Sequence, residues 1–252
     1  MKNKIVLITG ATSGIGWATA QEFKKAGAKL ILCGRRKEKL ELLDNKLGGK
    51  QKLLNFDVRN KNEVFKSFES LPENWKDIDL LINNAGNAHG LDPVQSASIE
   101  DWDSMIDGNV KGLMYVTKAV LPSMIKRKKG HIINLGSIAG KEVYPNGSVY
   151  CSSKAAVDFF TRGLRIDLNP LGIRVGAIHP GLVETEFSDV RFKGDKKRAS
   201  AVYEGMEALT AKEVASSILY MANVPEKVTI ADMIILPTRQ ANSYINNRKN
   251  SL

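Results

Sequence analysis

The chain has 252 residues, a length at which α/β architectures commonly form one domain. Its 43% hydrophobic and 25% charged residues are ordinary for a soluble globular protein. No apolar run approaches the ~18 residues of a membrane span, and the apolar run at the N-terminus is too short for a signal peptide. The net charge of +10 is scattered, and its clusters at 126–129 and 193–198 lack interleaved aromatic residues; it indicates a solvated surface rather than a nucleic-acid site.

Apolar runs between turn residues predict seven strands, and these alternate with segments of helical periodicity or length. The predicted strands are Ile5–Thr9, Lys29–Cys33, Gln51–Phe56, Asp79–Asn83, His131–Leu135, Arg174–His179 and Thr229–Leu236. The predicted helices are Gly16–Ala26, Glu38–Leu47, Lys61–Glu69, Ile99–Arg127, Val149–Leu168 and Ala211–Ala222. Strands rich in Ile, Leu and Val that alternate with helices predict a doubly wound parallel sheet with helices on both faces. No linker or repeat divides 1–252, so we expect one domain, with a loose polar tail over 242–252.

A glycine-rich loop follows the first predicted strand and opens the first helix. It reads TGATSGIG over residues 9–16, with glycines spaced G-x-x-x-G-x-G. Such glycines allow a tight turn and let backbone N–H groups approach a pyrophosphate at the start of the helix. The loop predicts a dinucleotide site that includes Gly10, Thr12, Ser13, Gly14, Ile15 and Gly16.

The end of the second strand indicates which dinucleotide binds. NAD sites commonly place an acidic residue there for the ribose hydroxyls, but this chain has Arg35 and Arg36. Two guanidinium groups suit the 2′-phosphate of NADP, although arginines are also ordinary at a solvent-facing helix start. Asp57 and Val58, after strand three, are expected near the adenine. The run 84–86 (Asn84, Ala85 and Gly86) closes strand four on the rim where such sheets bind ligands.

Tyr150 and Lys154 are four residues apart, which places them on one face of a helix. A free phenol has a pKa of ~10, too high for efficient proton transfer at neutral pH. A nearby ammonium would lower the pKa of the phenol. This spacing also occurs by chance on helix surfaces, so a catalytic role for the pair depends on the other motifs. The cysteines, Cys33 and Cys151, form neither a disulfide framework nor a zinc cluster; we expect no metal and a reducing cytoplasm.

The combined motifs resemble the short-chain dehydrogenase/reductase family over essentially the whole chain. The matching residues are TGATSGIG at 9–16, NNAG at 83–86, Asn109, Ser137, YCSSK at 150–154, Pro180-Gly181 and Thr185, with Val183 between them. The resemblance implies a Rossmann fold, an NADP-binding role for Pro180, Gly181, Val183 and Thr185, and a homotetramer. It also implies a catalytic tetrad of Asn109, Ser137, Tyr150 and Lys154.

In this resemblance, Tyr150 exchanges a proton with the substrate oxygen, and Ser137 hydrogen-bonds that oxygen. Lys154 lowers the pKa of Tyr150 and binds the nicotinamide ribose, and Asn109 holds a water connected to Lys154. Outside the family context, Ser137 could simply cap a turn and Asn109 could be a structural polar group within a helix.

Segments 98–107 and 180–192 resemble one branch of the family, the NADP-dependent 3-hydroxy acid dehydrogenases. That branch oxidises serine, L-allo-threonine and related acids, and reduces malonic semialdehyde. Residues 184–205 are expected to form a lid, in which Arg191 or a neighbouring lysine pairs with a substrate carboxylate. The alternative is a surface loop whose charges only confer solubility.

Two alternative functions remain open at this stage. The fold and tetrad do not identify the substrate, so a broad carbonyl or sugar-alcohol reductase is possible. A regulatory protein that binds NADP without turnover is a second possibility, although it would not need the whole tetrad. His131 and His179 are expected to be packing or capping residues, whereas His89 could reach the substrate.

Overall fold

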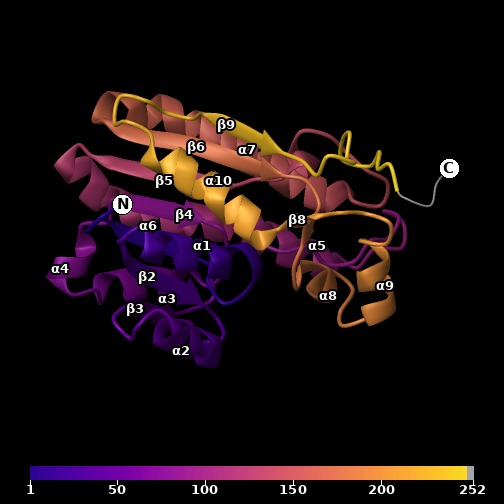
Figure 1. Cartoon of the computed structure of the whole chain (residues 1–252), viewed down its shortest axis with the longest axis horizontal. Helices are drawn as coiled ribbons and strands as arrows, with labels where there is room; N and C mark the ends of the chain where they lie inside the picture. The colour runs from indigo at the N-terminus through magenta and orange to yellow at the C-terminus, as the bar shows by residue number, and fades with distance from the viewer. Residues whose placement is uncertain (249–252) are drawn as a thin grey trace.

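The structure is a computed structural model and describes residues 1–248. Its main sheet has seven parallel strands in the order β3-β2-β1-β4-β5-β6-β9 (Figure 1). The strands are β1 (Ile5–Thr9), β2 (Lys29–Gly34), β3 (Lys52–Asn55), β4 (Leu80–Asn83), β5 (Gly130–Leu135), β6 (Ile173–Pro180) and β9 (Asp232–Ile235). The strand order reverses between β1 and β4, and ligands of such sheets bind at this switch point. The doubly wound fold predicted from the sequence is confirmed.

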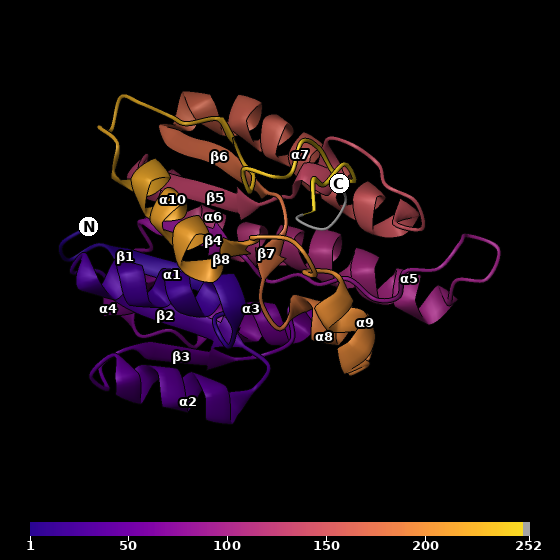
Figure 2. The ribbon, with the colours of Figure 1, turned by 45° about the vertical axis from the view of Figure 1, so that its right-hand side comes forward.

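Helices cover both faces of the sheet because the strands present apolar side chains to each side. One core joins the sheet to α3 (Lys61–Glu69), α6 (Gly112–Arg127) and α7 (Ser148–Leu168). The other joins it to α1 (Gly14–Lys25), α2 (Lys37–Lys46) and α10 (Ala211–Asn223). Figure 2 shows α1 and α10 side by side over one face. None of the helices in residues 1–248 is both long and apolar enough to cross a membrane.

The long helix predicted over Ile99–Arg127 is divided. It consists of α5 (Ile99–Ile106), a π-helical turn at Asp107–Lys111 and α6. Such turns are uncommon and occur frequently at functional sites. Hydrophobic periodicity did not reveal this one, because a π turn adds a single residue within a continuous apolar pattern. It places Asn109 in the protein interior, 1% exposed.

The predicted lid segment contains two short helices, α8 (Phe187–Arg191) and α9 (Lys196–Ala201). A two-stranded sheet, β7 (Val183–Glu184) with β8 (Leu209–Thr210), joins the two ends of this segment. The short α4 (Glu73–Lys76) completes the α-helices of residues 1–248, which also contain 3₁₀ turns at Ile138–Gly140 and Asn169–Leu171. Figures 1 and 2 show α8 and α9 beyond the carboxyl ends of the strands, where the switch point opens.

The polar tail predicted from residue 242 lies against the molecule as far as it is described. Ser243 N donates to Glu142 Oε2 at 2.9 Å. Arg248 donates to the carbonyl oxygens of Val202 and Glu204, both in the lid segment. Residues 242–248 therefore connect the lid to the loop before α7, and residues 249–252 of the predicted tail lie outside the described residues.

Candidate active site

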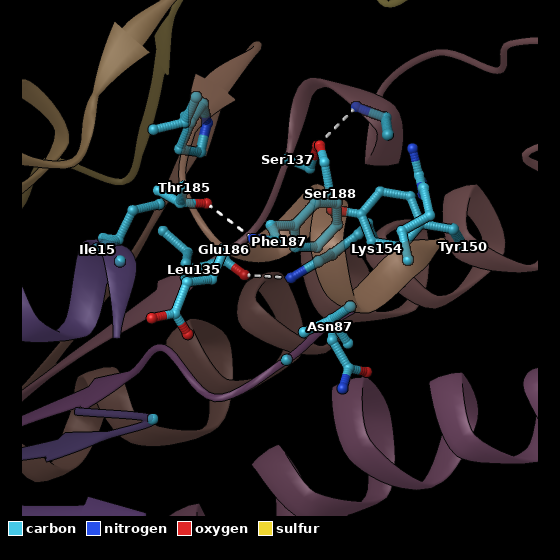
Figure 3. Close-up of a pocket in the computed structure, with 18 of the residues that line it drawn as sticks. Ile15, Asn87, Leu135, Ser137, Tyr150, Lys154, Thr185, Glu186, Phe187 and Ser188 are labelled. Carbon is cyan, nitrogen blue, oxygen red and sulfur yellow. Dashed lines mark hydrogen bonds between the residues drawn. The ribbon is translucent and has the colours of Figure 1, made fainter. Parts of the chain in front are cut away.

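A cavity of about 970 Å³ opens at the carboxyl ends of the strands. Almost all site residues predicted from the sequence line it: Gly10, Thr12, Ser13, Gly14, Ile15, Arg35, Arg36, Asp57, Val58, Asn84, Ala85, Gly86, Ser137, Tyr150, Lys154, Pro180, Gly181, Val183, Thr185 and Arg191. Gly16 and Asn109 lie behind its wall. In Figure 3, Ile15 and Thr185 lie on one side of the pocket, and Ser137, Tyr150 and Lys154 on the other.

The glycine-rich loop adopts a conformation that requires its glycines. Gly10 and Gly14 have positive φ, at 64° and 50°, which side chains with a Cβ rarely adopt. At Gly16, a Cβ would overlap Gly10 O and lie 2.5 Å from Asn84 Nδ2. These glycines therefore let the first turn of α1 pack directly against the loop. The Ser13 side chain does not cap the helix, so backbone N–H groups at the start of α1 remain for a ligand.

The NNAG segment is held to the glycine loop by hydrogen bonds. Thr9 Oγ1 accepts from the backbone N–H groups of Asn84 at 3.0 Å and Ala85 at 2.9 Å. Asn84 Nδ2 donates to Thr9 O at 2.9 Å. Asn83 has a different role, because its Nδ2 donates to Thr117 Oγ1 and Asn134 Oδ1 inside the core. The two halves of the switch point thus form one rigid rim.

Three arginines gather where the ribose of a dinucleotide would end. Arg36 donates to Thr12 Oγ1 at 3.3 and 3.2 Å, and also pairs with Glu186 of the lid at 3.0 Å. Asp57 lies between Arg35 at 3.5 Å and Arg59 at 2.7 Å. Burial acts to raise the pKa of Asp57, but the hydrogen bonds and charges of the arginines outweigh it and lower the pKa.

Arg59 was not predicted as a site residue. It lies two positions after Asp57 and lines the same cavity. Its position just after Asp57 and Val58, at the end of strand three, was a signal in the sequence that could have identified it.

Tyr150 and Ser137 come together from different elements. Ser137 follows β5, where its Oγ accepts from Ala139 N at 3.1 Å, and Tyr150 lies in the first turn of α7. Burial raises the pKa of Tyr150, while the positive charge of Arg191 and a hydrogen bond with Ser137 act to lower it. The predicted lowering of this pKa by Lys154 is therefore not what this structure shows: the net shift is upward, and the opposing cation is Arg191. The reason is that the phenol ring is packed beneath the lid, against Phe187 and Arg191.

Lys154 is 5% exposed and donates to Leu135 O at 2.9 Å. Burial lowers its pKa to about 8. Asn109 lies nearby: its Nδ2 donates to Asn87 O at 2.8 Å and Ser153 Oγ at 3.0 Å, and its Oδ1 accepts from Asn87 N at 2.8 Å. A Cβ at Gly86 would lie 2.9 Å from Asn109 Oδ1 and 3.5 Å from Lys154 Nζ. Gly86 therefore permits both side chains to approach the cavity wall.

Arg191 covers Tyr150 from the lid. Its guanidinium carbon lies 5.0 Å from the Tyr150 ring centre, 5.3 Å from that of Phe187 and 5.6 Å from that of Tyr144. Arg191 also donates to the Tyr144 hydroxyl. Tyr144 and Phe187 were missed in the sequence analysis, because no motif marks either position and only the fold brings them to Tyr150.

The histidines lie in different surroundings. His131 is buried, with its pKa lowered to about 3, which agrees with a packing role. His179 is fully buried; its Nδ1 lies 3.3 Å from Ser137 O and its Nε2 lies 2.8 Å from Asp232. His89 borders a smaller pocket that Tyr150 and Arg191 also line.

Asp158, His179 and Asp232 place possible metal-ligand atoms within 4.8 Å of one another. The Lys141 ammonium already bonds both carboxylates, to Asp158 at 2.9 Å and Asp232 at 2.6 Å. Lys141 thus supplies the countercharge that a metal would bring.

The cavity fits a dinucleotide that carries an extra phosphate. The loop brings backbone rather than side chains toward a pyrophosphate, the uncapped helix start favours an anion, and Arg35, Arg36 and Arg59 lie on the same rim. In the part of the cavity wall after β2, no carboxylate takes the place of the arginines. The arginines and the missing carboxylate distinguish a site for NADP from one for NAD, whereas the loop and the helix start suit the pyrophosphate of either.

Comparison with known proteins agrees with this geometry. Residues 4–196 match the family model for the short chain dehydrogenases. The NADP-dependent 3-hydroxy acid dehydrogenase YdfG of Salmonella typhi is 47% identical over 94% of this chain and 96% of its own. The NADP-dependent 3-hydroxy acid dehydrogenase of Schizosaccharomyces pombe is 46% identical over 95% of each chain.

Two similar proteins of known structure are also dehydrogenases. A serine dehydrogenase in its closed form with NADP⁺ is 44% identical, covers 97% of this chain and 99% of its own, and has a TM-score of 0.93. The serine dehydrogenase of Escherichia coli is 40% identical over 94% of this chain and 99% of its own, with a TM-score of 0.83. The chain belongs to the short-chain dehydrogenase family.

Proposed function

We propose that this protein transfers a hydride between NADP(H) and C3 of short 3-hydroxy acids, such as serine, L-allo-threonine or 3-hydroxypropionate. One observation carries the proposal: the Tyr150 phenol lies beneath the Arg191 guanidinium, in the same cavity as the glycine loop and the rim arginines. A proton donor, an anion-binding cation and a dinucleotide site are thus side by side. The names of the relatives support both the cofactor and the substrate class.

The bound cofactor supplies or accepts the hydride, so the protein's tasks are positioning and proton transfer. Burial keeps Tyr150 protonated at neutral pH, which makes it a general acid toward a carbonyl oxygen. In the oxidative direction, Tyr150 must accept the proton of the substrate hydroxyl. The charge of Arg191 then favours the phenolate that assists this step.

The remaining tetrad residues support Tyr150. Ser137 can donate a hydrogen bond to the substrate oxygen and hold its developing charge. Lys154 would hold the nicotinamide ribose. We assign Asn109 to a water beside Lys154, because both side chains approach Gly86 from behind the cavity wall. The hydrogen bonds of Asn109 to Asn87 and Ser153 fix its orientation.

The proposal is tested with a substrate panel. Serine, L-allo-threonine, 3-hydroxypropionate, 3-hydroxybutyrate and uncharged alcohols are assayed with NADP and with NAD. We expect the highest kcat/KM for a 3-hydroxy acid with NADP. Equal or better turnover of uncharged alcohols would instead identify a broad carbonyl or sugar-alcohol reductase, and a preference for NAD would contradict our assignment of Arg35 and Arg36.

We also infer a cytoplasmic homotetramer. Two separate faces of the monomer expose large apolar side chains: α7 exposes Phe159 and Ile166, while α10 and β9 expose Tyr220 and Ile234. Two different self-complementary faces are what a tetramer with two-fold axes requires. Light scattering should give four chains, and Phe159→Glu should reduce the assembly to a dimer. A monomeric wild-type protein would contradict the inference.

A further inference from the structure

Arg191 is the cation of the lid that remains directed toward Tyr150. Two neighbouring lysines are engaged elsewhere, since Lys193 pairs with Asp101 at 2.9 Å and Lys196 pairs with Asp189 at 2.9 Å. The backbone of Arg191 is also anchored, because its carbonyl oxygen accepts from Gly90 N at 2.9 Å. The fold therefore anchors the backbone that carries this guanidinium.

The guanidinium has donor capacity left over. Arg191 Nε is buried and has no hydrogen-bond partner within residues 1–248. A buried donor without a partner is costly, and a bound acceptor would relieve that cost. Arginine presents its donors as a planar fork that matches the two oxygens of a carboxylate. The unpartnered Nε thus leaves one donor of this fork without an acceptor, which a ligand could supply.

Tyr144 lies beside another donor of the guanidinium, Nη2. Its hydroxyl accepts a hydrogen bond from Arg191, and a phenol that accepts still has its own proton to donate. Burial raises the pKa of Tyr144, so the proton stays in place at neutral pH. The ring is seated closely against Gly147, where a Cβ would overlap Tyr144 Cε2. This contact shows that the loop before α7 is shaped around the ring.

We propose that Tyr144 and Arg191 form a carboxylate clamp in which the substrate accepts from the Arg191 fork and from the Tyr144 hydroxyl. The clamp rests on the proposed function and names its specificity-determining residue, Tyr144. The carboxylate and hydroxyl carbons of a 3-hydroxy acid are separated by two C–C bonds of about 1.5 Å each. A guanidinium 5.0 Å from the Tyr150 ring centre suits that short span.

The test compares 3-hydroxypropionate with 1,3-propanediol, which differ only in the carboxylate. Tyr144→Phe removes one charge-assisted hydrogen bond, so kcat/KM for the acid should fall about 10- to 100-fold, mainly through KM. The value for the diol should change less than about twofold. Lys37→Ala, at an exposed side chain that does not line the cavity, serves as the control and should leave both substrates unaffected.

A second variant disturbs the clamp without removing a hydrogen-bonding group. Gly147→Ala should displace the Tyr144 ring and reproduce the selective loss for the acid. The inhibition constant of malonate, an unreactive carboxylate, gives a readout without turnover and should rise in both variants. In a double-mutant cycle, Tyr144→Phe and Arg191→Met should be strongly non-additive, because each residue acts on the same carboxylate.

The outcomes separate the two proposals. Equal losses for acid and diol in Tyr144→Phe, or no loss for either, would overturn the clamp while wild-type turnover of 3-hydroxy acids still supports the proposed function. A wild-type protein that oxidises no 3-hydroxy acid with NADP would overturn the proposed function and the clamp together.

Discussion

The two ends of the cavity are constructed differently. The cofactor end is made from short, contiguous segments, in which Gly10, Gly14 and Gly16 shape one turn. The substrate end is made from single side chains that are distant in the sequence, with Tyr144 and Arg191 meeting over Tyr150. The cofactor end depends on backbone conformation and the substrate end on tertiary packing. Variants should therefore affect the two ends separately.

Tyr150→Phe should give the largest difference between the two ends, with turnover lost and NADPH affinity kept. General acid–base catalysis contributes about 10²- to 10⁴-fold, so kcat should fall by that order. The ring is retained, and NADPH affinity, measured by fluorescence titration, should stay within about threefold. If the protein were instead a regulatory protein that binds NADP without turnover, its regulatory effect would survive in this variant. Parallel loss of turnover and NADPH affinity would show that the two ends are not independent.

Arg36→Ala tests the cofactor end alone. Losing charge-assisted hydrogen bonds to a 2′-phosphate should raise the KM for NADP about 10- to 100-fold. The KM for NAD should change little, because NAD lacks that phosphate. The neighbouring, exposed Lys37 provides the control, and Lys37→Ala should leave the ratio of the two cofactors unchanged. Equal effects on NADP and NAD would mean that Arg36 acts through Thr12 or Glu186 instead.

Gly16→Ala tests whether the cofactor end depends on close backbone packing. The added methyl group would meet Gly10 O and Asn84 Nδ2, and such overpacking should lower the free energy of unfolding by about 1–3 kcal/mol. NADPH binding should weaken with it. Lys37→Ala is the control, since Lys37 is exposed on α2 and lies outside the loop. Similar urea midpoints for both variants would contradict this account of the loop.

Lys154 should make the stability of the protein depend on pH. Its pKa is about 8 in the folded chain and 10.5 as a model value for the unfolded chain. Between these values the unfolded chain binds the extra proton, so the contribution of Lys154 to stability rises with pH. From pH 7.5 to 10, the wild-type protein should gain stability relative to Lys154→Met in urea unfolding. A constant difference would show that burial does not shift this pKa.

The features that could be predicted from the sequence are those determined by residues close together in the chain. Strand positions follow from apolar runs, and the glycine loop follows from residues 10–16, because a strand, a turn and a helix start need no distant partner. Tyr150 and Lys154 were likewise found from a helical spacing. Their interpretation changed, however, since the charge acting on the phenol is that of Arg191.

Residues without a local signal emerged only once the chain was folded. Asn109 is placed by a π turn that leaves no mark on hydrophobic periodicity, and Tyr144 is placed by its packing on Gly147. The protein's amino-acid order thus contains the fold class and the dinucleotide loop in contiguous patterns. The acidity of Tyr150 and the surroundings of Arg191 could not be found in this way. They depend on burial and nearby charge, and the residues responsible come from distant parts of the chain.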